Sequence, residues 1–183
     1  MRKLQDAARN LIREHGFDSV SVAEIGQRAG VAPTLVSAHF GSKSGLLYSL
    51  VVALNEGQLE TALKEDEQGG SAQERLTRVL VTWCSADLSD PRILAAAQAL
   101  SWTWTQEAEE HNLQLRNAAQ ALLGRIVEAG QTSGEFRAIP LDRAVTMLWA
   151  LYTWGLRPAV FTACRPADCA EEIVAQCLAL LSH

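Results

Sequence analysis

The sequence lacks any long apolar run. Although 48% of its residues are hydrophobic, no stretch approaches the roughly 18–20 apolar residues that a membrane-spanning helix needs. It also lacks an N-terminal basic stretch followed by an apolar stretch and a cleavage site, which is the layout of a secretion signal. These absences predict a soluble, cytoplasmic protein without a membrane partner.

Residues that bind metals or perform nucleophilic chemistry are few and scattered. They are Cys84, Cys164, Cys169, Cys177, His15, His39, His111 and His183. No C-x-x-C pair occurs, and no cysteine has a histidine nearby in sequence, so we expect neither a zinc site nor a disulfide scaffold. No catalytic pattern is recognisable, and we expect no cofactor, no metal and no enzymatic activity. Cys164 and Cys169 are close enough to suggest a redox switch, but Arg165 and Pro166 between them favour a turn, and buried free thiols are the alternative.

The chain carries no excess of positive charge, since its formal net charge is −5. This excludes a uniformly basic nucleic-acid binder, but the charge is unevenly distributed. Residues 1–48 contain six basic and four acidic side chains, a net charge of +2, which leaves −7 for the remainder. A module that tolerates a polyanion, attached to a body that repels one, is typical of a protein that touches DNA at one end.

Strand signals are nearly absent, whereas apolar residues recur at three- and four-residue spacing throughout. The sequence therefore predicts an all-α protein of about nine helices in two groups, residues 1–48 and 49–183. Capping patterns mark helix starts at Ser21 and Ser71, each followed by a glutamate three positions later. Asp90 and Asp168 are expected to cap two further helices. Residues 141–163 are apolar nearly all round and are predicted to form one helix.

Residues 25–47 contain two short predicted helices joined by a turn at Gly30, the layout of a helix-turn-helix. The run SVAEIGQRAGVAPTLVSAHFGSKSGLL resembles the DNA-binding segment of the TetR family of bacterial repressors, whose usual run has a Thr or Ser cap, Ala-Gly-Val, a helix ending in Phe, Ser-Lys and Leu-Leu. The resemblance covers residues 4–50. It implies a three-helix DNA-binding domain followed by a larger helical domain for ligand binding and dimerisation.

The candidate DNA-binding residues are Ser21, Arg28, Ala32, Pro33, Thr34, Ser37, His39 and Lys43. Short side chains at the start of a recognition helix let its backbone approach the base edges. Thr34 is expected to contact a base, whereas Ser37 and His39 are expected to contact phosphates. Lys43 begins a helix, where its charge and the free N–H groups both attract phosphate. The alternatives are solvated side chains for Thr34 and Ser37 and a capping or packing role for His39. For Lys43 the alternative is an ordinary surface lysine.

Departures from the family pattern limit what the resemblance implies. An aromatic residue is often found where Ser37 stands, the usual capping serine is Ala32, and an acidic residue common at Gly45 is missing. The resemblance therefore implies no particular operator sequence.

The C-terminal helices, predicted over 141–163 and 169–182, carry more apolar surface than one small domain covers. The TetR resemblance implies that they form a homodimer interface, with internal core as the alternative. The five tryptophans all lie after residue 48, and the candidate ligand-binding residues are Trp83, Trp102, Trp104, Trp149 and Tyr152. They are expected to line a cavity for an apolar or aromatic ligand, with a plain aromatic core as the alternative.

The resulting hypothesis is a DNA-binding transcriptional regulator, a repressor whose partners are a double-stranded operator, a small-molecule inducer and a second copy of the chain. The alternative is a helical protein of enzymatic or interaction type whose N-terminal helices are structural. An orphaned regulator without ligand control stays open as well.

Overall fold

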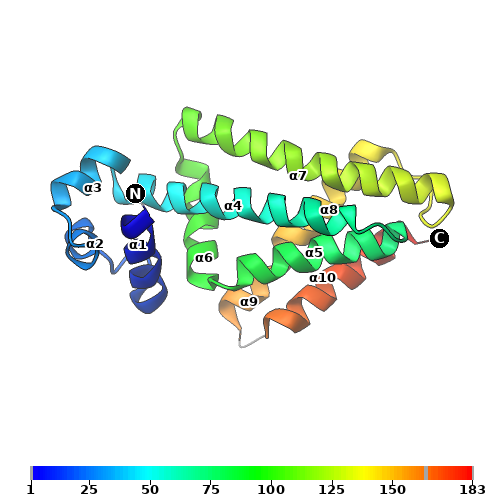
Figure 1. Ribbon diagram of the computed structural model, residues 1–183. Helices are drawn as coiled ribbons and strands as arrows, with labels where there is room; N and C mark the ends of the chain where they lie inside the picture. Colours follow the sequence, from blue (N-terminus) through cyan, green and yellow to red (C-terminus); the bar gives the residue numbers. More distant parts are fainter. Residues whose placement is uncertain (1, 163–164, 183) are drawn as a thin grey trace. The chain divides into compact units, whose positions relative to one another are not determined.

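The computed structural model describes residues 2–162 and 165–182. Regular structure in these ranges consists of ten α-helices and one short 3₁₀-helix, η1. In order they are α1 (Arg2–His15), α2 (Val22–Ala29), α3 (Pro33–Phe40), α4 (Lys43–Glu67), α5 (Ala72–Leu88), α6 (Pro91–Leu100), η1 (Ser101–Thr103), α7 (Gln106–Ser133), α8 (Leu141–Gly155), α9 (Arg157–Phe161) and α10 (Pro166–Leu181) (Figure 1). The predicted all-α fold is confirmed. No helix within the described ranges is long and apolar enough to cross a membrane.

The chain divides into two compact units. Unit 1 comprises Met1–Asn55 and Asp90–Asn112, and unit 2 comprises Glu56–Ser89 and Leu113–His183. Unit 1 therefore contains α1 to α3, the first half of α4, α6 and η1. Packing thus brings residues 90–112 together with the N-terminal helices. The functional division into domains 1–48 and 49–183 stays a prediction.

Unit 1 has one hydrophobic core, built from one apolar stripe on each of its helices. Its buried members are Leu4, Ala7, Ala8, Leu11, Ile12, Val20, Ile25, Val36, Leu46, Leu47, Leu50, Val51 and Ile93. The short helices α2 and α3 each supply one large side chain that is 0% exposed, Ile25 and Val36, and the partly buried Val22 and Phe40 pack against the same core. Such short helices are marginal in isolation, so α2 and α3 depend on this packing for their stability.

In unit 2, α10 packs against both α5 and α8 (Figure 1). Leu80, Leu148 and Ile173 contribute fully buried side chains from these three helices. Cys84, Cys169 and Cys177 are buried, while Cys164, the other half of the suggested redox pair, lies outside the described residues. Burial raises the pKa of the Cys84 thiol to about 12, and that of Cys177 also to about 12. Thiols with such pKa values are unreactive at neutral pH.

The single helix predicted over 141–163 is wrong. The structure ends α8 at Gly155 and begins α9 at Arg157. Pro158 explains the break, because proline has no N–H to donate and its ring clashes with the carbonyl four residues earlier. Gly155 lies close to α10, since a Cβ built there would be 2.5 Å from Ile173 Cγ1.

Of two further predicted caps, Asp168 is wrong, whereas Asp90 is the N-cap residue of α6 as predicted but lacks the side-chain hydrogen bond of a cap. The side chain of Asp168 does not cap α10, which begins earlier, at Pro166; instead its carboxylate accepts hydrogen bonds of 2.9 and 2.6 Å from Arg165. The Asp90 side chain makes no cap hydrogen bond to α6. Its carboxylate accepts a hydrogen bond from Arg13 on α1 instead. For Asp90, an arginine that tertiary packing brings close has thus taken the place of the local cap hydrogen bond.

Candidate DNA-binding surface and buried aromatic cluster

Helix α2 begins with a complete capping box. Ser21 Oγ accepts a hydrogen bond from the Glu24 N–H at 3.2 Å, and the Glu24 carboxylate accepts one from the Ser21 N–H at 2.8 Å. The Ser21 hydroxyl also donates to this carboxylate at 2.7 Å, and this bond together with the one from the Ser21 N–H lowers the pKa of Glu24. The predicted cap is therefore confirmed. Ser21 is exposed, so its position is open to a ligand although its hydroxyl already has partners.

The turn between α2 and α3 is held by backbone contacts. Gly30 has a φ of 71°, which favours glycine, and its N–H donates to Gln27 O at 3.2 Å. The chain then approaches α2 closely, because a Cβ built on Gly26 would lie 2.9 Å from Val31 O. This tight turn fixes how α3 leaves α2, as a helix-turn-helix requires.

Helix α3 presents a surface of short side chains. Ala32, the N-cap, makes no side-chain cap hydrogen bond, and Pro33 occupies the first turn. Ala32, Pro33, Thr34, Ser37 and His39 are all exposed. Five of the eight predicted DNA-binding residues thus lie together on or beside one short exposed helix.

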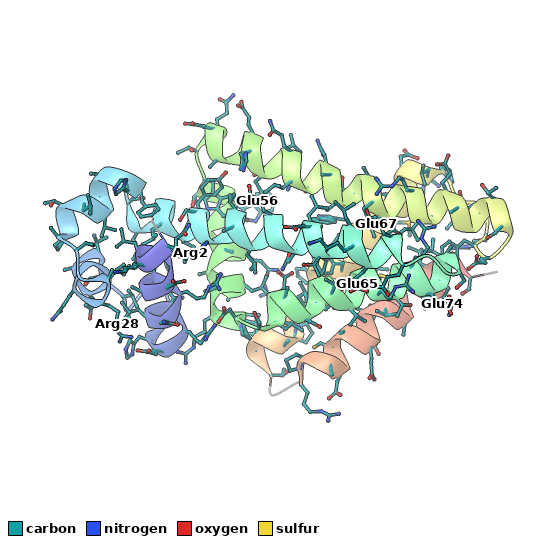
Figure 2. All side chains as sticks on the ribbon, in the orientation of Figure 1. Arg2, Arg28, Glu56, Glu65, Glu67 and Glu74 are labelled. Carbon is teal, nitrogen blue, oxygen red and sulfur yellow. The ribbon has the colours of Figure 1, made fainter. Side chains whose placement is uncertain are left out.

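Arg28, near the end of α2, is paired with α1. Its guanidinium donates to both carboxylate oxygens of Glu14, at 3.2 and 3.0 Å. The hydrogen bond raises the pKa of Arg28 and lowers that of Glu14. Both side chains are about half exposed, so the pair adds little stability. Its geometry still sets the direction of the Arg28 side chain, which Figure 2 labels on α2.

Lys43, at the first position of α4, points toward the loop between α1 and α2. Its Nζ donates to the carbonyl oxygens of Phe17 and Val20 at 2.8 and 3.0 Å. It also lies 4.3 Å from the centre of the Phe17 ring, a cation–π distance. Sequence reasoning expected this ammonium to serve a phosphate and missed its role within the fold.

The charge asymmetry expected from the sequence can be followed on the structure. Figure 2 labels Arg2 and Arg28 in unit 1 and Glu56, Glu65, Glu67 and Glu74 in unit 2. The labelled arginines thus belong to the unit that holds α3, and the labelled glutamates to the other unit. Summed over all residues the formal charges of units 1 and 2 are −1 and −4, so the excess of positive charge is confined to residues 1–48 of unit 1.

Three of the five predicted ligand-binding residues form one cluster in unit 2. The ring centroids of Trp83 and Trp149 are 6.1 Å apart, and Tyr152 lies 5.5 Å from Trp83 and 5.6 Å from Trp149. Most of these contacts are edge-to-face, a favourable arrangement for aromatic rings. Trp83 on α5 and Tyr152 on α8 are buried, and Trp149 is partly buried.

Trp102 and Trp104 belong to unit 1 and are not part of this cluster. Trp102 is 93% exposed. Trp104 packs edge-on against Tyr48 at 5.2 Å. The five predicted residues are thus divided between the two units, three in unit 2 and two in unit 1.

A buried carboxylate that sequence reasoning missed adjoins the aromatic cluster. Asp87 on α5 is 9% exposed and accepts hydrogen bonds from the Tyr152 hydroxyl and, at 2.6 Å, from Gln58 Nε2. Burial raises the pKa of Asp87, and burial together with the nearby carboxylate raises that of Tyr152. Asp87 stands at an inward position of an apolar helix, and that was the signal available in the sequence. A carboxylate beside three rings suits a ligand with a hydrogen-bond donor or a positive charge.

The described residues contain no group of three or more His, Cys, Asp or Glu side chains that could hold a metal ion.

Comparison with known proteins gives a consistent result for the N-terminal region. Residues 4–50 match the family model described as bacterial regulatory proteins, tetR family. The HTH-type transcriptional regulator BetI of Rhizobium meliloti is 30% identical over 109 residues, which are 60% of this chain and 53% of that protein. The fatty acid metabolism regulator protein of Bacillus subtilis is 29% identical over 140 residues, 72% of this chain and 68% of that protein. The match to BetI thus spans about half of the length of that relative.

The fold is similar to that of solved TetR-family structures over nearly the whole chain. PfmR from Thermus thermophilus has a TM-score of 0.79 at 22% identity and covers 98% of both chains. FadR from Bacillus subtilis, solved in complex with stearoyl-CoA, has a TM-score of 0.79 at 20% identity and covers 97% of both chains. The chain thus combines a helix-turn-helix in α2 and α3, a match to the tetR family model over residues 4–50, and a fold shared with solved structures of that family over nearly the whole chain.

Proposed function

We propose that this protein is a DNA-binding transcriptional regulator that represses from an operator and is released by a small, largely apolar or aromatic ligand. The observation that carries the proposal is α3, an exposed helix of short side chains held in a helix-turn-helix within a unit whose N-terminal 48 residues have a net charge of +2. Such a helix fits a major groove about 12 Å wide. A regulator of this kind acts on chromosomal DNA and so works in the cytoplasm.

The DNA contacts follow from where the exposed residues lie. Thr34 is directed outward near the start of α3, so we assign it to a base edge, and Ser37 and His39 to phosphates on either side. Ser21 and Arg28 on α2, and Ala32 and Pro33 through the backbone that they expose, complete the surface. Lys43 binds the loop before α2, and its positive charge adds to the attraction of this surface for phosphates.

A second copy of the chain completes the reading of an operator. One short helix discriminates too weakly between an operator and other DNA sequences, because each good bidentate contact to a base contributes only about 1–3 kcal/mol. We propose that two copies pair through α8, α9 and α10. This is supported by exposed apolar side chains on α8 and α9, with Met147, Trp154 and Phe161 being 40%, 72% and 71% exposed.

The cluster of Trp83, Trp149 and Tyr152 is the proposed ligand-contacting surface, and Asp87 supplies its polar group. The likeness to FadR supports the view that this fold can hold a ligand with a long apolar chain, since that protein was solved with stearoyl-CoA. Trp102 and Trp104, in unit 1, are not needed for this site.

The alternative, an enzyme or an interaction protein, has less support. TetR-family proteins are transcription regulators, and we propose no catalytic activity for this chain. Burial raises the pKa of Asp87, but its carboxylate accepts hydrogen bonds from Tyr152 and Gln58, an arrangement without an activated nucleophile.

The test begins with selection of bound fragments from sheared genomic DNA by the purified protein. We expect a small set of fragments with an inverted repeat, and failure to enrich any fragment would contradict the proposal. With an enriched fragment, Thr34→Val, which keeps the shape but removes the hydroxyl, should relax preference at one base position per half-site. Ser37→Ala should weaken binding to all duplexes equally.

Release by a ligand is tested on the protein bound to the enriched fragment. A panel of apolar and aromatic molecules is added, and release is followed by fluorescence anisotropy. We expect Trp149→Ala to raise the concentration needed for release without changing operator affinity in its absence. Trp102→Ala, an exposed tryptophan in unit 1, is the matched control and should respond as the native protein does.

A further inference from the structure

The recognition helix α3 lacks the side chains that read bases by paired hydrogen bonds. Its sequence, PTLVSAHF, contains no Arg, Lys, Asn, Gln, Asp or Glu. Arginine and lysine read guanine, and asparagine and glutamine read adenine, through two hydrogen bonds each. Direct hydrogen-bond readout by α3 is therefore limited to the hydroxyls of Thr34 and Ser37 and the imidazole of His39.

The outward face of α3 is instead largely apolar. At about 100° per residue, the buried Val36 and the partly buried Phe40, one turn later, define the inward side. Thr34 and Ala38 then lie on the opposite side, and Leu35 lies beside them, closer to its centre than Ser37 or His39. Leu35 is 42% exposed, and it is the largest side chain on this face.

A single exposed leucine is common on protein surfaces and needs no explanation by itself. Two features distinguish Leu35. Its neighbours on the face are small, so its side chain reaches further from the helix than theirs. It also lies in the first turn of α3, the part of a recognition helix that contacts base edges.

The major groove offers an apolar side chain one distinctive feature, the 5-methyl group of thymine. Resting on the proposed function, we propose that Leu35 reads this methyl group, with the methyl groups of Thr34 and Ala38 packing beside it. Each half of the operator then has a thymine at the position that faces Leu35. A 5-methylcytosine presents the same methyl group and should substitute for it in this contact.

The expected effect is modest and measurable. Burial of one methyl group against an apolar side chain corresponds to about a fourfold change in affinity at each half-site. Two half-sites on a dimer multiply this factor. Removal of the methyl group from any of the remaining thymines should change affinity much less.

The experiment starts from a random-sequence duplex library, from which the protein selects its preferred duplex. That duplex is synthesised with deoxyuridine in place of each thymine in turn, which removes only the methyl group. Affinities are measured for the native protein, Leu35→Ala and Leu35→Met. We expect one position per half-site at which deoxyuridine weakens native binding about fourfold, and no such loss with Leu35→Ala.

Two further arms test the chemistry of the contact. Leu35→Met keeps an apolar side chain and should retain sensitivity to the methyl group. At the sensitive position, a 5-methylcytosine·guanine pair should bind better than a cytosine·guanine pair with the native protein, and equally with Leu35→Ala. Leu113→Ala on α7 removes a leucine that is also 42% exposed and should behave as the native protein does.

The outcomes separate this inference from the function on which it rests. Enrichment of a duplex whose binding ignores deoxyuridine at every position would overturn the inference and leave the regulator function standing. Methyl sensitivity that persists in Leu35→Ala would also overturn it, because another side chain would then be the reader. Failure to enrich any duplex would contradict both.

Discussion

The Nζ of Lys43 lies 2.8 Å from the carbonyl oxygen of Phe17, so the first residue of α4 fastens the loop that precedes α2. We expect Lys43→Ala to lower the free energy of unfolding by about 1–3 kcal/mol, since two partly buried carbonyl oxygens lose a charged donor. It should also weaken binding to all duplexes and reduce the salt dependence of binding by about one phosphate contact. Urea denaturation and anisotropy titrations over a range of salt concentrations measure the two effects.

Lys3→Ala, an exposed lysine on α1, is the matched control for stability and should change it by less than about 0.5 kcal/mol. An unchanged salt slope for Lys43→Ala, together with reduced stability, would show that the ammonium serves the fold alone.

Two arginine pairs in unit 1 differ in burial and should differ in their contribution. The side chain of Asp90, which pairs with Arg13, is 8% exposed, whereas that of Glu14, which pairs with Arg28, is 46% exposed. Arg13→Met leaves a nearly buried carboxylate without its main partner, so we expect a loss of about 2–4 kcal/mol in the free energy of unfolding. Arg28→Met should cost less than about 1 kcal/mol. If guanidinium denaturation gives equal losses in the free energy of unfolding for the two variants, burial does not determine how much each pair stabilises the fold.

The raised pKa of Asp87 makes the stability of the protein depend on pH. The folded state holds the proton of this carboxyl more tightly than the unfolded state does, and this difference stabilises the fold at low pH. That stabilisation is lost as the pH rises from 3.8, the ordinary pKa of an aspartate, toward the raised pKa of Asp87. Asp87→Asn cannot ionise. Its stability relative to the native protein should therefore increase with pH over this window and then level off.

Urea denaturation between about pH 4 and about pH 8 measures this difference. Asp142→Asn, at an exposed carboxylate on α8, is the control for the substitution itself. A constant difference between Asp87→Asn and the native protein across the window would show that Asp87 has a similar pKa in both states.

Trp154 is the large apolar residue that α8 leaves most exposed, at 72%. If α8 and α10 form the dimer interface, Trp154→Glu places a charge within it and should shift the protein from twice the chain mass to the chain mass of 19.9 kDa. Analytical ultracentrifugation at micromolar concentration measures this change. Trp102→Glu, in unit 1, should leave the dimer intact. A dimer that survives Trp154→Glu would place the interface elsewhere.

Local sequence determined the helices and most of their starts. Ser21 with Glu24 and Ser71 with Glu74 were recognisable as capping boxes, and both form as expected. Such motifs involve residues three positions apart, so the chain needs no tertiary contact to specify them. The inward positions of Ile25 and Val36 also followed from helical spacing, and with them the outward placement of Thr34.

The partners of charged and polar side chains could be decided only by the tertiary structure. Asp90 was expected to cap α6, but Arg13, distant in sequence, binds its carboxylate. Lys43 and Asp87 likewise found partners on segments that no spacing rule connects with them. A long side chain or a buried carboxylate takes whichever partner packing brings within about 3 Å, and that depends on where every helix lies.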